Sequence, residues 1–172
     1  MKQPWSKTRQ ILEQDFLCES LRGRVMYFQT RYHKAHDDGG RVVVIVDKVE
    51  KINFPFTNET AGYFTVVERG IDYTNLSRDE YMKLLNEIES ELKSKGIFEP
   101  WDFFEAVEIL FSSDIQDALK SENPVVRMLA ILDRRVGKRS LERIKLTVDK
   151  QPEWLQFFYR LRLEAEGIKV ES

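Results

Sequence analysis

Positive charge is concentrated near the end of the chain, in the segment DRRVGKRSLERIK (residues 133–145). Its cations are Arg134, Arg135, Lys138, Arg139, Arg143 and Lys145. Clustered cations attract anions such as phosphate groups, a nucleic-acid backbone or the carboxylates of another protein. Arg134 and Arg135 fall in the last turn of a predicted helix, where the helix dipole favours a cation. Lys138 and Arg139 fall at the start of the next predicted helix, where positive charge is disfavoured unless an anion lies close. These four residues are the predicted anion-binding or partner-binding site.

The anion that Lys138 and Arg139 need has two sources, and the sequence leaves both open. One source is internal, because residues 77–123 carry 12 Asp and Glu residues against 5 Lys and Arg residues. The candidate internal partners are Glu99, Asp102, Glu105, Glu108, Asp114 and Asp117. The other source is external: a phosphate at the helix start, a nucleic-acid backbone or an acidic protein. Opposed acidic and basic segments favour recognition of another molecule, since complementary charges steer the encounter.

Two histidines and two aspartates lie close together, at His33, His36, Asp37 and Asp38. Such side chains bind a divalent metal when three or four of them converge on one point. On a β-hairpin, the odd spacing of His33 and His36 points them to opposite faces, and Asp and Gly residues here also suit a plain turn. We therefore predict no metal site.

Catalytic motifs are missing from the sequence. Cys18 is the single cysteine, so neither an intramolecular disulfide nor a cysteine-rich zinc site can form. A nucleophilic cysteine needs a positioned base, which the sequence does not place near Cys18. The chain also lacks a Gly-rich phosphate-binding loop, a GxSxG motif and an HExxH motif. We predict no catalytic residue and no cofactor.

The bulk composition excludes several classes of protein. Of the 172 residues, 42% are hydrophobic and 33% are charged, which is typical of a globular domain rather than a disordered chain. No apolar run is long enough to span a membrane, and the N-terminus lacks the apolar stretch of a secretory signal. Together with the lone cysteine, this predicts a cytoplasmic protein without membrane contacts. The net charge of −2 gives no overall attraction to nucleic acids.

The predicted fold is α+β, and its first part is a helix followed by a small antiparallel sheet. The helix begins near Ser6. A hairpin is expected over 24–47, because an alternating segment, a Gly-rich turn and a β-branched run follow one another. Its expected core face holds Met26, Phe28 and Tyr32. A third strand is expected at 63–67, and the less clear stretch 48–61 has room for another short edge strand.

Helical signals begin at Leu76. Ser77 and Glu80 form a capping box, in which each satisfies the other's free backbone amide. The predicted buried face of this helix holds Tyr81, Leu84, Leu85, Ile88 and Leu92. Several short helices follow and form a multi-helix lobe. Because no linker-like stretch separates the parts, we expect one domain over 1–172, with a helix-and-sheet sub-lobe at 1–75 and a helical sub-lobe at 76–172.

Four segments of the chain resemble a family of small bacterial proteins of unknown function. They are QPWSKTRQILE, SLRGRVMYFQTRYHKAHDDGGR, NPVVRMLAILDRRVGKRSL and PEWLQFFYRLRLEAEGI. The resemblance spans nearly the whole chain, and the stretch from Lys48 to Ile97 contributes little to it. It implies a bacterial, cytoplasmic, stand-alone protein and brings no established activity or catalytic residue. Small proteins of this style often bind another protein, for example to neutralise a toxin.

The expected function is a non-catalytic protein-interaction module, a neutralising or regulatory partner of another protein. The first alternative is a binder of nucleic acid or of a phosphorylated ligand through residues 134–145. The second alternative is a metal-dependent or Cys-dependent enzyme. The sequence assigns no oligomeric state.

Overall fold

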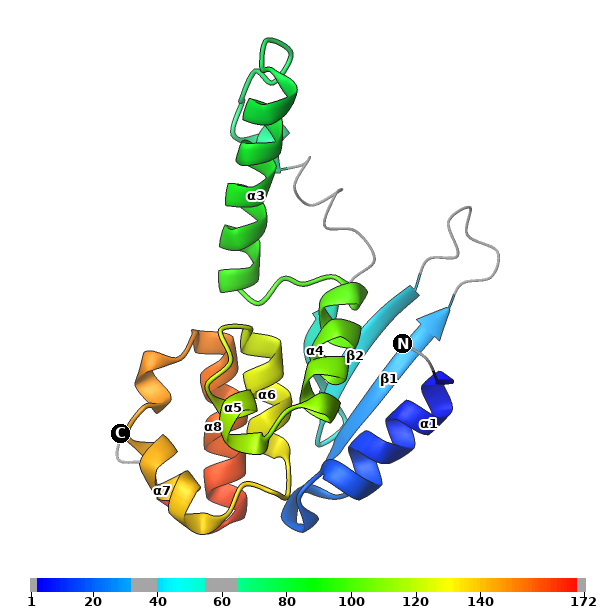
Figure 1. The fold of residues 1–172 in the computed structure, drawn as a ribbon, viewed down its shortest axis with the longest axis vertical. Helices are drawn as coiled ribbons and strands as arrows, with labels where there is room; N and C mark the ends of the chain where they lie inside the picture. The colour runs from blue at the N-terminus through cyan, green and yellow to red at the C-terminus, as the bar shows by residue number, and fades with distance from the viewer. Residues whose placement is uncertain (1–2, 32–39, 55–64, 170–172) are drawn as a thin grey trace.

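The computed structural model describes residues 3–31, 40–54 and 65–169 of the chain. The predicted α+β class is confirmed: an N-terminal helix and a three-stranded antiparallel sheet precede a group of helices (Figure 1). The N-terminal helix starts as α1 (Trp5–Gln10) and continues as a π-helical turn, η1 (Ile11–Phe16). A short 3-10 turn, η2 (Glu19–Leu21), then leads to the sheet.

The sheet has the strand order β1 (Val25–Arg31), β2 (Gly40–Val46), β3 (Val49–Phe54). Asp47 and Lys48, with φ of 50° and 68°, form the two-residue turn between β2 and β3. Two residues with positive φ match the twist of a tight hairpin, so the next strand pairs at once. Strand β3 thus lies within the stretch 48–61, whose fold the sequence left open. The strand expected at 63–67 is wrong, because its described residues, 65–67, are helical.

The core face of β1 is the opposite of the expected one. Val25 and Tyr27 are buried, whereas the side chains of Met26 and Phe28 are 38% and 46% exposed. The Tyr27 ring packs against Phe103 at a centroid distance of 5.8 Å, which fixes this face toward the helices. Tyr32, the third residue of the expected core face, lies outside the described residues.

The helical lobe consists of five helices, two of which flank the central one. They are α4 (Pro100–Ser112), α5 (Ile115–Leu119), α6 (Pro124–Leu132), α7 (Lys138–Lys145) and α8 (Glu153–Ala165). Helix α6 lies between α4 and α8, and most of its residues are buried (Figure 1). Asn123 caps α6 by accepting a hydrogen bond from Val125, and Pro124 occupies the first turn. Helix α4 also packs on the sheet, so one hydrophobic core joins sheet and helices.

Helix α3 (Arg78–Ser94) connects the sheet half to the helical lobe. The predicted capping box is confirmed: Ser77 Oγ accepts from the Glu80 amide, and Glu80 Oε2 accepts from the Ser77 amide. Of the apolar face predicted for this helix, only Ile88 and Leu92 are buried. Figure 1 shows α3 projecting from the rest of the molecule, which explains why its face is only partly covered.

Candidate functional site

The predicted basic segment forms the turn between α6 and α7, and this turn is fixed to the N-terminal part of the chain. Asp133 ends α6, and Gly137 precedes α7. The Cys18 amide donates to the Leu132 carbonyl (3.0 Å), and the Arg134 amide donates to the Phe16 carbonyl (2.6 Å). The two segments thus lie side by side as a short antiparallel bridge. Their backbone bonds hold the turn in one conformation.

Arg135 stabilises this junction between the turn and the N-terminal segment. Its guanidinium donates to both oxygens of Asp133, with Nε–Oδ1 at 3.1 Å and Nη2–Oδ2 at 2.8 Å. The Asp133 side chain is fully buried, whereas 34% of the Arg135 side chain is exposed. The guanidinium carbon lies 4.5 Å from the centre of the Phe16 ring, a cation–π contact. Arg135 therefore neutralises a buried carboxylate and covers an aromatic ring.

A buried cation, Arg162 of α8, also binds the turn. Its Nη2 donates to the Val136 carbonyl (3.1 Å), and its Nη1 donates to Glu166. Ser20 Oγ donates to the same Glu166 oxygen at 2.8 Å. Burial raises the pKa of Glu166, but the Ser20 hydrogen bond and the charges of Arg162 and Lys138 outweigh burial and hold that pKa below its ordinary value. Sequence analysis missed this network, although the four-residue spacing of Arg162 and Glu166 on one helix was a usable signal.

Three further cations of the basic segment face the solvent. Arg134, Lys138 and Arg139 are exposed, and none of them forms an ion pair with another residue that the structure describes. We call these three residues the basic turn. Two of the acidic residues that could have paired with them are engaged elsewhere: Asp102 binds Lys93 (2.9 Å), and Asp114 caps α5. The binding role assigned to Arg134, Arg135, Lys138 and Arg139 stays a prediction.

The first turn of α7 adds hydrogen-bond donors to this surface. No side chain caps α7, and no acidic residue lies in its first turn. The amides of Ser140 and Leu141 donate to the Gly137 carbonyl, whereas those of Lys138 and Arg139 bond to no group in the described part of the chain. Cationic side chains and free amides at a helix start are suited to bind a carboxylate or phosphate oxygen. The arrangement can bind an anion and contains no reacting group.

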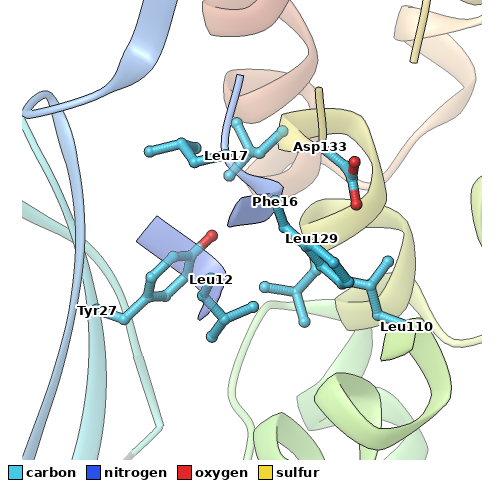
Figure 2. A pocket seen from close by; sticks show the side chains of 8 residues that line it. Leu12, Phe16, Leu17, Tyr27, Leu110, Leu129 and Asp133 are labelled. Atoms are coloured by element: carbon cyan, nitrogen blue, oxygen red, sulfur yellow. The ribbon is translucent and has the colours of Figure 1, made fainter. Parts of the chain in front are cut away.

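A small pocket lies beneath the turn, and it is too tight for a substrate (Figure 2). Leucine side chains lie in it between Tyr27 of β1 and Asp133 at the end of α6, and no volume remains for a water molecule. Burial, with the nearby charges of Glu13 and Asp133, raises the pKa of Tyr27 above its ordinary value. Tyr27 therefore stays neutral at physiological pH and acts as a packing residue.

The structure describes Cys18 but does not describe the histidine and aspartate cluster that the sequence offered as a candidate metal site. Cys18 is buried, with its Sγ 3.4 Å from Ser20 Oγ. His33, His36, Asp37 and Asp38 lie outside the described residues. Among the residues that are described, no three His, Cys, Asp or Glu side chains gather closely enough to hold a metal ion. None of the helices placed by the structure is both long and apolar enough to cross a bilayer.

Comparison with known proteins identifies a family. The model of the SF0329 protein family matches residues 4–163, which is most of the chain. No curated protein and no solved structure matches.

Proposed function

The chain belongs to the SF0329 protein family, and since that name carries no activity, we propose from the geometry that it is a non-catalytic interaction module. In this proposal the basic turn (Arg134, Lys138 and Arg139) binds an acidic surface of a partner protein. The observation that carries it is a difference within one turn of fixed backbone: Arg135 pairs with the buried Asp133, whereas the exposed Arg134, Lys138 and Arg139 form no ion pair with a described residue. The proposed setting is the cytoplasm, where Cys18 stays reduced.

A fixed turn favours binding because little conformational entropy of the backbone is lost when a partner docks. Exposed charges at the rim of an interface accelerate association and select partners of opposite charge. An acidic protein fits better than a nucleic acid. The exposed cations of this surface share it with two carboxylates, Glu142 on α7 and Glu166, on which the charge of Lys138 acts, whereas proteins that bind a nucleic-acid backbone neutralise many phosphates.

The test compares partner capture by three proteins in a nuclease-treated bacterial lysate at low salt. They are the wild type, the charge-reversed variant R134E/K138E/R139E, and the control R78E/K83E/K120E, which makes the same charge change elsewhere. We expect the wild type and the control to retain the same partner, and the charge-reversed variant to lose at least about 90% of it. Capture that is equal in all three proteins would exclude the basic turn as the binding surface. A parallel wild-type capture without nuclease separates the alternatives: nucleic acid retained there, with no protein retained after nuclease treatment, would favour the nucleic-acid alternative.

A further inference from the structure

Residues 65–97, which we call the arm, pack around a small hydrophobic cluster of their own. Val66, Ile88 and Leu92 are its buried members, and Ile71, Tyr73, Leu84 and Ile97 pack on them. No residue of this cluster belongs to the main core described above. Figure 1 shows α3, the long helix of the arm, extending away from the sheet and the helical lobe. The arm therefore gains little stability from the rest of the described molecule.

The base of the arm rests on the lobe at Gly96. Gly96 follows α3 in the left-handed conformation (φ +82°), and the Ile97 amide donates to the Leu92 carbonyl, as in a glycine-terminated helix. The Trp154 ring lies directly against this glycine, because a Cβ added there would be 2.8 Å from Trp154 Cγ. Phe98, two residues further on, is buried against the same ring at 5.1 Å. The backbone between Gly96 and Phe98 thus joins arm and lobe.

An ion pair crosses the same junction. Lys93 Nζ on α3 lies 2.9 Å from Asp102 Oδ1 on α4, and the other Asp102 oxygen accepts from the Glu99 amide. Burial lowers the pKa of Lys93, but the hydrogen bonds and charges of Asp102 and Glu89 raise that pKa by more. The Lys93 ammonium group therefore stays charged. On the lobe side of the junction, the indole Nε1 of Trp154 is buried without a hydrogen-bond partner in the described residues. A buried donor without a partner costs free energy, so exposure of this group to water would offset part of the cost of opening.

We propose that the arm undocks from the helical lobe and unfolds as a cooperative unit of its own, separately from the main core, with residues 96–98 as its junction to the lobe. The Gly96–Trp154 contact and the Lys93–Asp102 ion pair form the latch that holds it closed. Segments with few buried apolar contacts open at lower free energy than the core to which they are attached. Opening exposes Trp154 and leaves the basic turn unchanged, so this device is independent of the proposed partner binding.

Amide hydrogen exchange of the full chain, followed by mass spectrometry, tests the proposal. In the wild type, peptides from α3 should exchange at least about tenfold faster than peptides from α6. The variant Gly96→Ala adds a Cβ that collides with Trp154, and should speed exchange in α3 at least about fivefold while α6 is unchanged. The matched control is Gly23→Ala. Gly23 also has a positive φ (+76°), but no atom beyond its chain neighbours lies within 4 Å of the point that a Cβ would occupy, so exchange in α3 should not change.

A second pair of variants keeps the test decisive if Gly96→Ala does not fold. Lys93→Gln removes the ion pair to Asp102 and also the pair to Glu89 within α3, and should speed exchange in α3 alone. Glu89→Gln removes only the pair within α3 and should speed exchange less. Lys83→Gln removes an exposed lysine from the same helix and should have no effect. The proposal is overturned if α3 and α6 exchange at one common rate in the wild type, or if Lys93→Gln changes both helices equally.

Discussion

Arg135 and Asp133 form an ion pair in which the Asp133 side chain is fully buried and the Arg135 side chain is one-third exposed. The guanidinium also covers Phe16, so one side chain joins the end of α6 to the N-terminal segment. Arg134, its neighbour in the chain, makes only a backbone bond to that segment and extends its side chain into solvent. Two consecutive arginines therefore have different surroundings: Arg135 stabilises the junction, and Arg134 is the one to which the proposed function gives a part in recognition.

The first prediction concerns this difference. Arg135→Met keeps an apolar cover on Phe16 but leaves the Asp133 carboxylate buried without its counter-charge, and should lower the free energy of unfolding by about 2–3 kcal/mol. Arg134→Met should change it by less than about 0.5 kcal/mol, because that side chain is exposed. Urea denaturation of both variants checks this. Equal losses in the two variants would contradict the assignment of Arg135 to cohesion.

The second prediction concerns Arg162, which is buried, with 3% of its surface exposed. Arg162→Met removes the bond to the Val136 carbonyl and the partner of Glu166, and should cost about 2–3 kcal/mol of unfolding free energy. Glu166 has a lowered pKa when folded, so its stabilising contribution is present above its ordinary pKa and disappears as the pH falls through the folded value. In Arg162→Met, the stability lost on acidification should be smaller than in the wild type. Urea denaturation at several acidic pH values would show this. An unchanged pH profile would argue against the ion pair.

The third prediction concerns Glu91 on α3. Hydrogen bonds from Arg69 and Lys95 lower its pKa from 4.5 to about 2. Its contribution to the stability of the arm is therefore complete above pH 4.5 and is lost as the pH falls from 4.5 toward 2. An NMR titration of the Glu91 carboxyl group should show the low pKa, and Arg69→Met should raise it. Arg78→Met, on the same helix, should leave it unchanged, and a rise of similar size in that control would contradict the specific pairing.

The fourth prediction concerns the capping box of α3. Ser77→Ala removes the acceptor for the Glu80 amide and should weaken the helix by about 1 kcal/mol. This corresponds to about fivefold faster amide exchange in α3. Ser90→Ala replaces an exposed serine inside the same helix and should leave exchange unchanged or slower, because alanine is the better helix former. Faster exchange in the Ser90 variant than in the Ser77 variant would contradict the role of the cap.

Elements with local determinants were predictable from the sequence. The Ser77–Glu80 cap depends on residues three positions apart, and the Asn123–Pro124 helix start depends on adjacent residues, so both follow from the sequence. The α+β order follows from the change of hydrophobic period from two to about 3.6 after the sheet. The position of the third strand could not be predicted from the sequence. The turn before it places Asp47 and Lys48 at positive φ, a conformation that is uncommon in residues other than glycine.

The sequence by itself thus determined the class of fold, the capped starts of α3 and α6 and the cluster of cations at 134–139. Only the tertiary structure decided which face of β1 is buried, because apolar residues lie on both faces and long-range contact with Phe103 selects the Tyr27 face. The tertiary structure likewise decided which cation is used internally. Arg135 is fixed by a carboxylate that becomes buried only when the N-terminal segment packs over it. Charge is a property of the sequence, whereas its desolvation depends on contacts between distant segments.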